Sequence, residues 1–359
     1  EEIKAASLDH ATHLDSLHIV DSRQTTETIW RTVASTNPGV IILDHLRLIK
    51  DQGENENKRQ GRISENLHDL ARLPWFDVVD GELRLDPAVG PCIDVHTHLA
   101  QSFIVPTNVD LSRESAEVLH YLPRARNFGF DRYLNQYFTA DDRKRMERDL
   151  VWGCFFGGTM RPTHTAGNLA REMKQVGVTT SVLLAIDWPI LSKNALEWLA
   201  ATRGRDDMVV FGSVHPLARD LAGKLDVQVA LGARGIKIHP AVQILAPDHP
   251  KMMELCRLCG ERDLPVFFHC GPVGIESEAA RNRCQVDRYR AVIAENPGTT
   301  FVLGHSGALQ PERAIAFARE FDHVWVEFAS QSLPVIERVC AEVNPSRICM
   351  GSDWPFYPQ

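Results

Sequence analysis

The sequence has no uninterrupted apolar run of the roughly 18 residues that a membrane-spanning helix requires. One of its most apolar stretches, TSVLLAIDWPIL at 180–191, is interrupted by Asp187 and Pro189. No signal peptide is recognisable either. We therefore expect a chain that does not enter a membrane.

An excess of positive charge is also missing. The 39 lysines and arginines are outnumbered by 47 aspartates and glutamates, which gives a net charge of −8 at pH 7. Because binding to phosphate backbones requires a basic surface, nucleic acid is not an expected partner. The sequence contains no glycine-rich phosphate-binding loop, so we expect no nucleotide cofactor. A small molecule is the expected ligand.

Cysteine is present but is not arranged for cross-linking. The eight cysteines are scattered along a long chain, a pattern typical of reduced thiols in a cytoplasmic protein. Cys256 and Cys259 form a CxxC pair, but no second CxxC is available to complete a zinc site. The surrounding segment, MMELCRLCGERD, is typical of a helix, so we expect both thiols to pack in the core.

From residue 91 onward, strand-like and helix-like segments alternate. The strand candidates are short and apolar, and they are 91–99, 179–187, 208–216, 233–240, 264–271, 299–307, 323–330 and 347–353. The amphipathic segments between them are 191–203, 217–231, 248–263, 279–296, 311–321 and 332–343. Eight such units predict parallel pairing and a closed (β/α)₈ TIM barrel of the α/β class. The rival fold, a doubly wound open sheet, is weakened by the missing Gly-rich turn.

Two regions stand outside this alternation. Residues 1–90 are expected to form an N-terminal extension of helices plus a hairpin at 75–87, and residues 91–359 the barrel domain. Within the barrel domain, 100–178 is predicted to be a largely helical insertion, either a lid over the active site or a peripheral packing element. Histidines of the extension could form an accessory metal site, but surface or capping roles explain them better: His10, His13, His18 and His45.

Five segments each end an apolar run on a metal-binding side chain. They are IDVHTHL (93–99), GIKIHP (235–240), FFHCG (267–271), VLGHSG (302–307) and MGSDWP (350–355). The candidate ligands are His96, His98, Lys237, His269, His305 and Asp353. Histidine nitrogens with one carboxylate suit a divalent cation such as Zn²⁺, although Mn²⁺ or Fe²⁺ could also bind. The set predicts a metal-dependent enzyme.

The positions of these residues strengthen the metal interpretation. His96 and His98 are two residues apart on one predicted strand, so they point to the same face. His269, His305 and Asp353 fall at or near the C-terminal ends of their strands, where barrel enzymes place their chemistry. A hydrogen-bonded core histidine or a capping aspartate would explain any one of them, but not the ordered set.

Lys237 shares a strand face with His239, while Ile236 and Ile238 face the outer helices. This pattern places an ammonium group inside the barrel, where an unpaired cation is costly. Three interpretations remove the cost: an ion pair with Asp353 or another acid, a bond to a substrate carboxylate, or carboxylation by CO₂ into an anion that bridges two metals. His239 is expected to support the site rather than to bind the ion.

This ordered set resembles the amidohydrolase superfamily. IDVHTHL, GIKIHP, PVFFHCG, GHSG and GSDWP resemble its amidohydrolase-related branch of metal-dependent TIM-barrel hydrolases, over about 91–355. The resemblance implies one ion at the HxH pair and the strand-eight Asp, a second at the strand-five and strand-six histidines, and a carboxylated lysine between them. One-metal members instead use the HxH pair, the strand-five His and the Asp. Homodimers are common among such relatives.

We therefore expect a hydrolase that directs a metal-activated water at an amide, lactone or ester-like bond. Asp353 would take the proton of that water, and His305 would help to stabilise the oxyanion.

The alternative is a one-metal non-oxidative decarboxylase or hydratase of an aromatic-derived acid. The carboxylate of that acid could bind to Lys237 or to one of three loop arginines: Arg161, Arg281 or Arg283. A barrel without catalytic activity is the third interpretation. Structural hydrogen bonds are expected of other polar residues: Asp187, His164, His215 and Glu327.

Overall fold

The computed structural model describes residues 76–79, 82–85, 90–103, 105–123, 132–156, 158–188 and 191–359. The chain divides into two compact units, Glu1–Gly90 and Pro91–Gln359. In the first unit, β1 (Phe76–Val79) pairs antiparallel with β2 (Glu82–Leu85), which confirms the predicted hairpin. The helices and the four histidines considered in the extension lie outside the described residues.

The second unit is built on eight parallel strands. They are β3 (Cys92–Thr97), β4 (Val178–Leu184), β5 (Met208–Phe211), β6 (Ile236–Ile238), β7 (Val266–His269), β8 (Phe301–Gly304), β9 (Val324–Glu327) and β10 (Ile348–Cys349). They pair in the orders β3-β4-β5 and β6-β7-β8-β9-β10. A bridge between Gly212 and Ile236 joins β5 to β6, and Val95 N donates to Met350 O beside a bridge from Thr97 to Trp354. The ring closes, so the predicted TIM barrel is confirmed.

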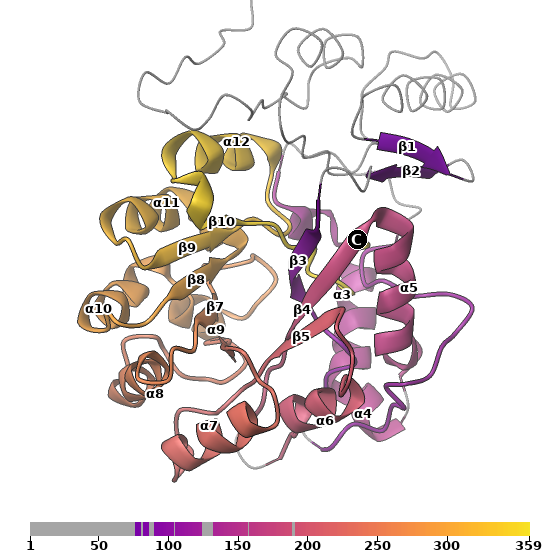
Figure 1. Cartoon of the computed structure of the whole chain (residues 1–359), viewed down its shortest axis with the longest axis horizontal. Helices are drawn as coiled ribbons and strands as arrows, with labels where there is room; N and C mark the ends of the chain where they lie inside the picture. Colours follow the sequence, from indigo (N-terminus) through magenta and orange to yellow (C-terminus); the bar gives the residue numbers. More distant parts are fainter. Residues whose placement is uncertain are drawn as a thin grey trace, which may run out of the picture. The chain divides into compact units, whose positions relative to one another are not determined.

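The helices lie around the outside of the strands (Figure 1). They are α5 (Ala166–Val176), α6 (Asn194–Ala201), α7 (Leu221–Ala230), α8 (Pro250–Gly260), α9 (Glu278–Arg283), α10 (Tyr289–Glu295), α11 (Pro311–Glu320) and α12 (Leu333–Glu342). The single helix predicted at 279–296 is instead divided into α9 and α10 by a 3₁₀ turn, Val286–Arg288. Among the helices of the described segments, none has the length and apolar character to cross a bilayer.

The insertion after β3 is less helical than predicted. The described parts of 100–123 contain no helix, because turns and long-range pairing hold this segment: Asp110 accepts from Ser112 N, and Ala166 N donates to Leu111 O. The helix predicted at 140–152 is present as α3 (Ala140–Glu147) with a π-helical turn, Arg148–Trp152, and α4 (Gly153–Phe156) follows. Thr139 begins α3 with a capping box, in which its hydroxyl accepts from Asp142 N.

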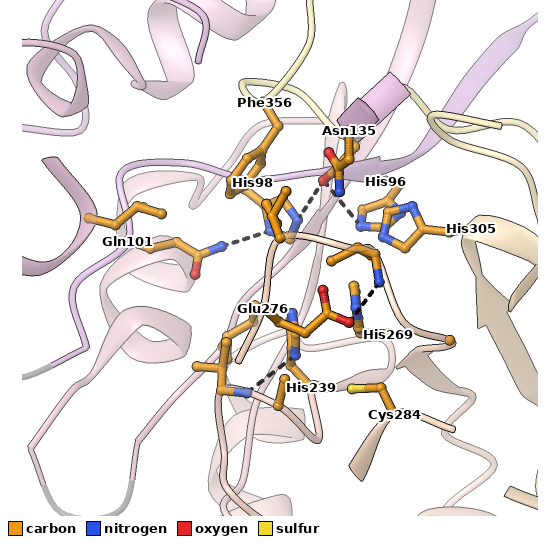
Figure 2. Close-up of a pocket in the computed structure, with 18 of the residues that line it drawn as sticks. His96, His98, Gln101, Asn135, His239, His269, Glu276, Cys284, His305 and Phe356 are labelled. Atoms are coloured by element: carbon orange, nitrogen blue, oxygen red, sulfur yellow. Dashed lines mark hydrogen bonds and ion pairs between the residues drawn. The ribbon is translucent and has the colours of Figure 1, made fainter. Parts of the chain in front are cut away.

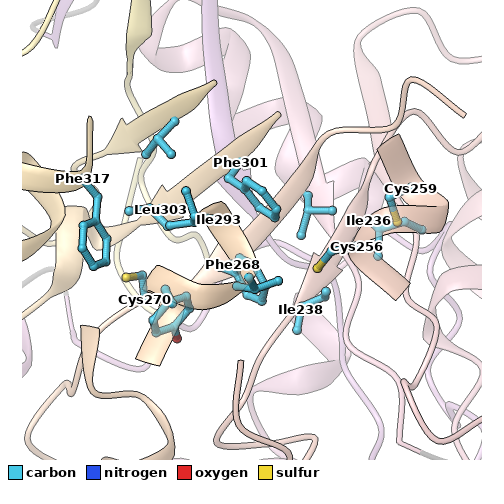
Figure 3. Packing of buried hydrophobic residues seen from close by; sticks show 14 of the residues in the cluster. Ile236, Ile238, Cys256, Cys259, Phe268, Cys270, Ile293, Phe301, Leu303 and Phe317 are labelled. Atoms are coloured by element: carbon cyan, nitrogen blue, oxygen red, sulfur yellow. The ribbon is translucent and has the colours of Figure 1, made fainter. Parts of the chain in front are cut away.

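Side chains of each strand alternate between two apolar layers. Ile236, Ile238 and Phe268 face outward into the main core, which they form with the inner faces of α8, α10 and α11 (Figure 3). Cys256 and Cys259 are free thiols in this layer, as predicted. The opposite strand faces fill the barrel interior with Val182, Leu184, Phe267 and Val302. This interior layer forms a floor beneath the C-terminal ends of the strands.

Candidate metal centre

Two histidines and one aspartate meet where β3 ends beside the segment that follows β10. Asp353 Oδ1 lies 3.2 Å from His98 Nε2 and 3.5 Å from His96 Nε2. The two segments are tied by the backbone, since Asp353 N donates to His96 O at 2.7 Å. Asp353 has a φ of 61°, in the left-handed region, where strained residues often mark functional sites. The structure therefore brings together the predicted HxH pair and the strand-eight aspartate.

Three imidazoles are each held through Nδ1, which leaves Nε2 directed at the cavity. His96 Nδ1 lies 2.9 Å from Glu327 Oε2, His98 Nδ1 2.8 Å from Leu184 O, and His305 Nδ1 3.1 Å from Ala329 O. Burial lowers the pKa of His96 well below its ordinary value and that of His305 to about 4. At neutral pH both rings are uncharged and can offer an Nε2 lone pair to a metal.

Glu327 connects two of these histidines. Its carboxylate is fully buried and accepts from His96 Nδ1, from His305 N at 3.0 Å and from Ala329 N. Burial raises the pKa of Glu327 to about 8. Gly351 permits this packing, because a Cβ there would lie 2.5 Å from both Glu327 Oε1 and His96 Cβ. The expected structural hydrogen bonding is confirmed, but the sequence did not reveal that Glu327 orients candidate ligands.

Lys237 points into the barrel, as predicted. Its side chain is buried, with Nζ 3.4 Å from His96 Nε2 and 4.4 Å from the centroid of the Phe267 ring. Burial lowers the pKa of Lys237 to about 7. Among the described carboxylates, none forms an ion pair with Lys237, so the first of the three interpretations, pairing with Asp353 or another acid, is not observed.

His269 lies in the same cavity but outside the tightest group. Its ring stacks on that of His239, with centroids 3.8 Å apart and planes 8° apart, and it lies 5.0 Å from the His305 ring. Burial lowers the pKa of both His239 and His269 well below the ordinary value. His239 therefore supports His269 by ring stacking.

The donor set suits a divalent ion. Ligand atoms of His96, His305 and Asp353 all lie within 4.8 Å of one another, and His98 Nε2 adjoins the same carboxylate oxygen. Imidazole nitrogens with one carboxylate fit Zn²⁺ or another borderline cation. Figure 2 shows the His96 ring beside that of His305, and the two ring centroids lie 4.8 Å apart.

The group opens into a cavity of about 230 Å³. The insertion and the loops contribute lining residues that the sequence analysis did not identify: Gln101, Phe103, Tyr133, Asn135, Glu276 and Phe356. No periodic pattern or motif marks these residues, because they come from irregular segments. Gln101 lies beside the HxH pair, with its amide nitrogen 2.9 Å from His98 Nδ1.

The other polar residues singled out in the sequence have structural roles. Asp187 accepts from Asn194 N at the start of α6, His215 contacts Gln243 O, and His164 contacts Leu119 O. The three loop arginines considered for a substrate carboxylate do not belong to the cavity lining of the described residues: Arg161, Arg281 and Arg283.

Known proteins share this architecture. A family model described as Amidohydrolase matches residues 93–359. An uncharacterized TIM-barrel protein from Bordetella bronchiseptica has a similar structure, with a TM-score of 0.51 and 14% sequence identity, over 75% of this chain and 88% of that chain. A search among curated proteins gave no match.

Two further structures are more distant. One is a probable 2-pyrone-4,6-dicarboxylic acid hydrolase from Acinetobacter baumannii, with a TM-score of 0.43 and 13% identity over 74% of this chain and 85% of that chain. The other is a dihydroxybenzoic acid decarboxylase from Polaromonas sp. JS666 with bound manganese, with a TM-score of 0.46 and 14% identity over 74% and 87%.

Proposed function

The chain belongs to the amidohydrolase family, which its residues 93–359 match, and from this premise we propose a metal-dependent hydrolase of an amide, lactone or ester-like bond in a small molecule. The observation that carries the proposal is the meeting of Asp353 Oδ1 with the Nε2 atoms of His96 and His98 at 3.5 and 3.2 Å. A carboxylate and lone-pair nitrogens at one point suit metal-assisted hydrolysis.

The residues proposed to hold the ion are His96, His98, His305 and Asp353, with His269 adjoining them. A divalent cation bound there would supply Lewis acidity, polarising a carbonyl group and acidifying a water molecule to a pKa of about 7. Zn²⁺ is the default, and Mn²⁺ or Fe²⁺ fits the same donors.

Asp353 is proposed as the proton carrier. It lines the cavity, and its backbone is anchored to His96 O, so its carboxylate has a fixed position next to the reacting groups. A carboxylate there can accept a proton from the attacking water and return it to the leaving group.

The environment of His305 suits a metal ligand better than a hydrogen-bond donor to the oxyanion. Its Nδ1 proton is directed at Ala329 O, so Nε2 carries a lone pair and has no proton to donate. Tyr133 is better placed as an oxyanion donor. Its hydroxyl is buried and forms no hydrogen bond with the described residues, and burial raises the pKa of Tyr133 well above its usual value, which keeps the proton in place.

We propose one ion rather than two. The ligand atoms of His96, His305 and Asp353 form one compact group, and His269 lies outside it, with its ring stacked on that of His239. A two-ion site would require Lys237 to be carboxylated and His269 to bind the second ion. The mass of the intact protein distinguishes these forms, since a carboxylated lysine adds the mass of CO₂.

The charge of the cavity favours hydrolysis over decarboxylation. Among the described lining residues, Lys237 is the only lysine or arginine, and burial lowers the pKa values of His96, His239, His269 and His305. The carboxylate of an acid substrate could therefore bind only to the ion and to Lys237, which carries a proton in about half of the molecules at pH 7.

Activity screening tests the proposal. Metal-loaded protein would be offered lactones, cyclic amides and esters, and in parallel aromatic and muconate-like acids with detection of CO₂. We expect hydrolysis in the first group, at a strongly reduced rate in Asp353→Asn. Release of CO₂ without hydrolysis would make the enzyme a lyase and contradict the proposal.

A further inference from the structure

One acidic residue of the cavity has no role in the chemistry described above. Glu276 lies in the loop between β7 and α9 and lines the cavity together with the histidines. Figure 2 shows its carboxylate among the labelled side chains of the pocket. Val273 N donates to Glu276 Oε1 at 3.1 Å, and this hydrogen bond orients the carboxylate.

The other oxygen of this carboxylate lacks a partner. Glu276 Oε2 is buried, and no described residue donates a hydrogen bond to it. Arg281 Nε lies 3.7 Å from Oε1, but the Arg281 side chain is 47% exposed, so this pair is weak and leaves Oε2 uncovered. A buried carboxylate oxygen without a donor is costly, and a ligand that supplies the donor recovers that cost.

The remaining wall of the cavity is largely apolar. Its members include Phe103, Ile186, Val242, Val273, Ile275 and Phe356. The volume of about 230 Å³ is below the roughly 300–1,000 Å³ of pockets for drug-sized ligands. The cavity thus combines a small apolar body, a candidate metal centre and one acidic group.

We propose that Glu276 selects the substrate by accepting a hydrogen bond from an amino group on it, so that the substrate is a small, largely apolar molecule with an amino group away from the bond that is cleaved. This inference rests on the proposed function, because it places the scissile group at the metal centre. It also excludes a carboxylate at the Glu276 end of the substrate, since two carboxylates would repel each other.

Three hydroxamic acids test the inference by binding. Benzohydroxamic acids with a 4-aminomethyl, 4-methyl or 4-carboxy substituent share a metal-binding group and differ only at the far end. Calorimetric titration into zinc-loaded protein measures each affinity without turnover. We expect the dissociation constant of the aminomethyl compound to be lower than that of the methyl compound by about tenfold or more. The carboxy compound should bind most weakly.

Two variants separate this role from general effects. Glu276→Gln keeps the shape of the side chain and removes its charge, so the preference for the aminomethyl compound should disappear while the methyl compound binds as before. Glu278→Gln, at an exposed acid two residues away, should keep the preference.

The outcomes distinguish the two proposals. If the methyl compound binds but the aminomethyl compound binds no better, or if Glu276→Gln keeps the preference, the inference is overturned and the metal centre stands. If none of the three compounds binds to zinc-loaded protein, the proposed function fails and the inference fails with it.

Discussion

Glu327 Oε2 lies 2.9 Å from Nδ1 of His96, and both side chains are almost completely shielded from solvent. This contact turns the imidazole so that Nε2 is directed at Asp353, 3.5 Å away. Glu327 also accepts from the backbone of His305, so a single carboxylate positions two candidate ligands. Supporting contacts of this kind fix the orientation of a metal ligand and increase its basicity.

Glu327→Gln should therefore weaken metal binding without removing a ligand. Glutamine places an NH₂ group where one of the accepting oxygens was, so the affinity for Zn²⁺ is expected to fall about 10- to 100-fold, as measured by competition with a chromophoric chelator. The matched control is Glu320→Gln, at a surface residue that pairs with Arg290 and should leave the affinity unchanged. Equal affinities in the two variants would contradict the orienting role.

Asp353→Asn should remove the proton carrier while the fold survives. Asparagine tolerates the left-handed backbone at this position, so little strain is added. We expect kcat on a cleaved substrate to fall by about 10²- to 10⁴-fold. The control is Asp322→Asn, at a fully exposed residue, for which kcat should not change. A near-native rate in Asp353→Asn would rule out the proposed role.

His164 should make the protein sensitive to acid. Burial lowers the pKa of His164 from 6.5 to about 3, so the ring stays neutral in the folded state while the unfolded chain takes up a proton below about pH 6.5. The contribution of neutral His164 to the free energy of unfolding is therefore fully present above about pH 6.5 and is lost as the pH falls toward 3. At pH 5 the loss from this residue is about 2 kcal/mol.

His164→Gln removes the titrating group and retains a donor for Leu119 O. Urea unfolding at pH 7 and pH 5 should show that the variant loses about 2 kcal/mol less than the wild type over this interval. An identical loss in both proteins would show that His164 does not contribute to acid sensitivity.

Phe268→Ala should destabilise the barrel strongly. Phe268 is completely buried in the outer core, where its ring centroid lies 5.1 Å from that of Tyr289 and 5.8 Å from that of Phe301. Truncation is expected to lower the free energy of unfolding by about 3–5 kcal/mol. Phe156→Ala, at a side chain that is 81% exposed, should change it by less than about 0.5 kcal/mol. Similar losses in the two variants would be inconsistent with this core.

The sequence predicted the barrel because its signals are local. In GIKIHP, the alternation of Ile236 and Ile238 with Lys237 specifies which side chains face the helices and which face the interior, and the structure has that arrangement. The helical content of 100–123 was overestimated, because its conformation depends on long-range backbone hydrogen bonds such as the one between Ala166 and Leu111.

The candidate site was only partly predictable. His96, His98, His305 and Asp353 could be found because they end apolar strands, and barrel topology brings strand ends together. Glu276 and Tyr133 could not, since they lie in irregular segments whose approach to the cavity depends on the tertiary fold. The chemical state of Lys237 and the number of ions are not determined by residue order.

The central claim is that His96 and His98, with His305 and Asp353, hold a divalent ion. The most direct measurement is the metal content after equilibrium dialysis against Zn²⁺, for the wild type and for a variant with His96→Asn and His98→Asn. The account predicts about one ion per wild-type chain and almost none in the variant. A wild-type protein without metal, or a variant that retains the full metal content, would contradict it.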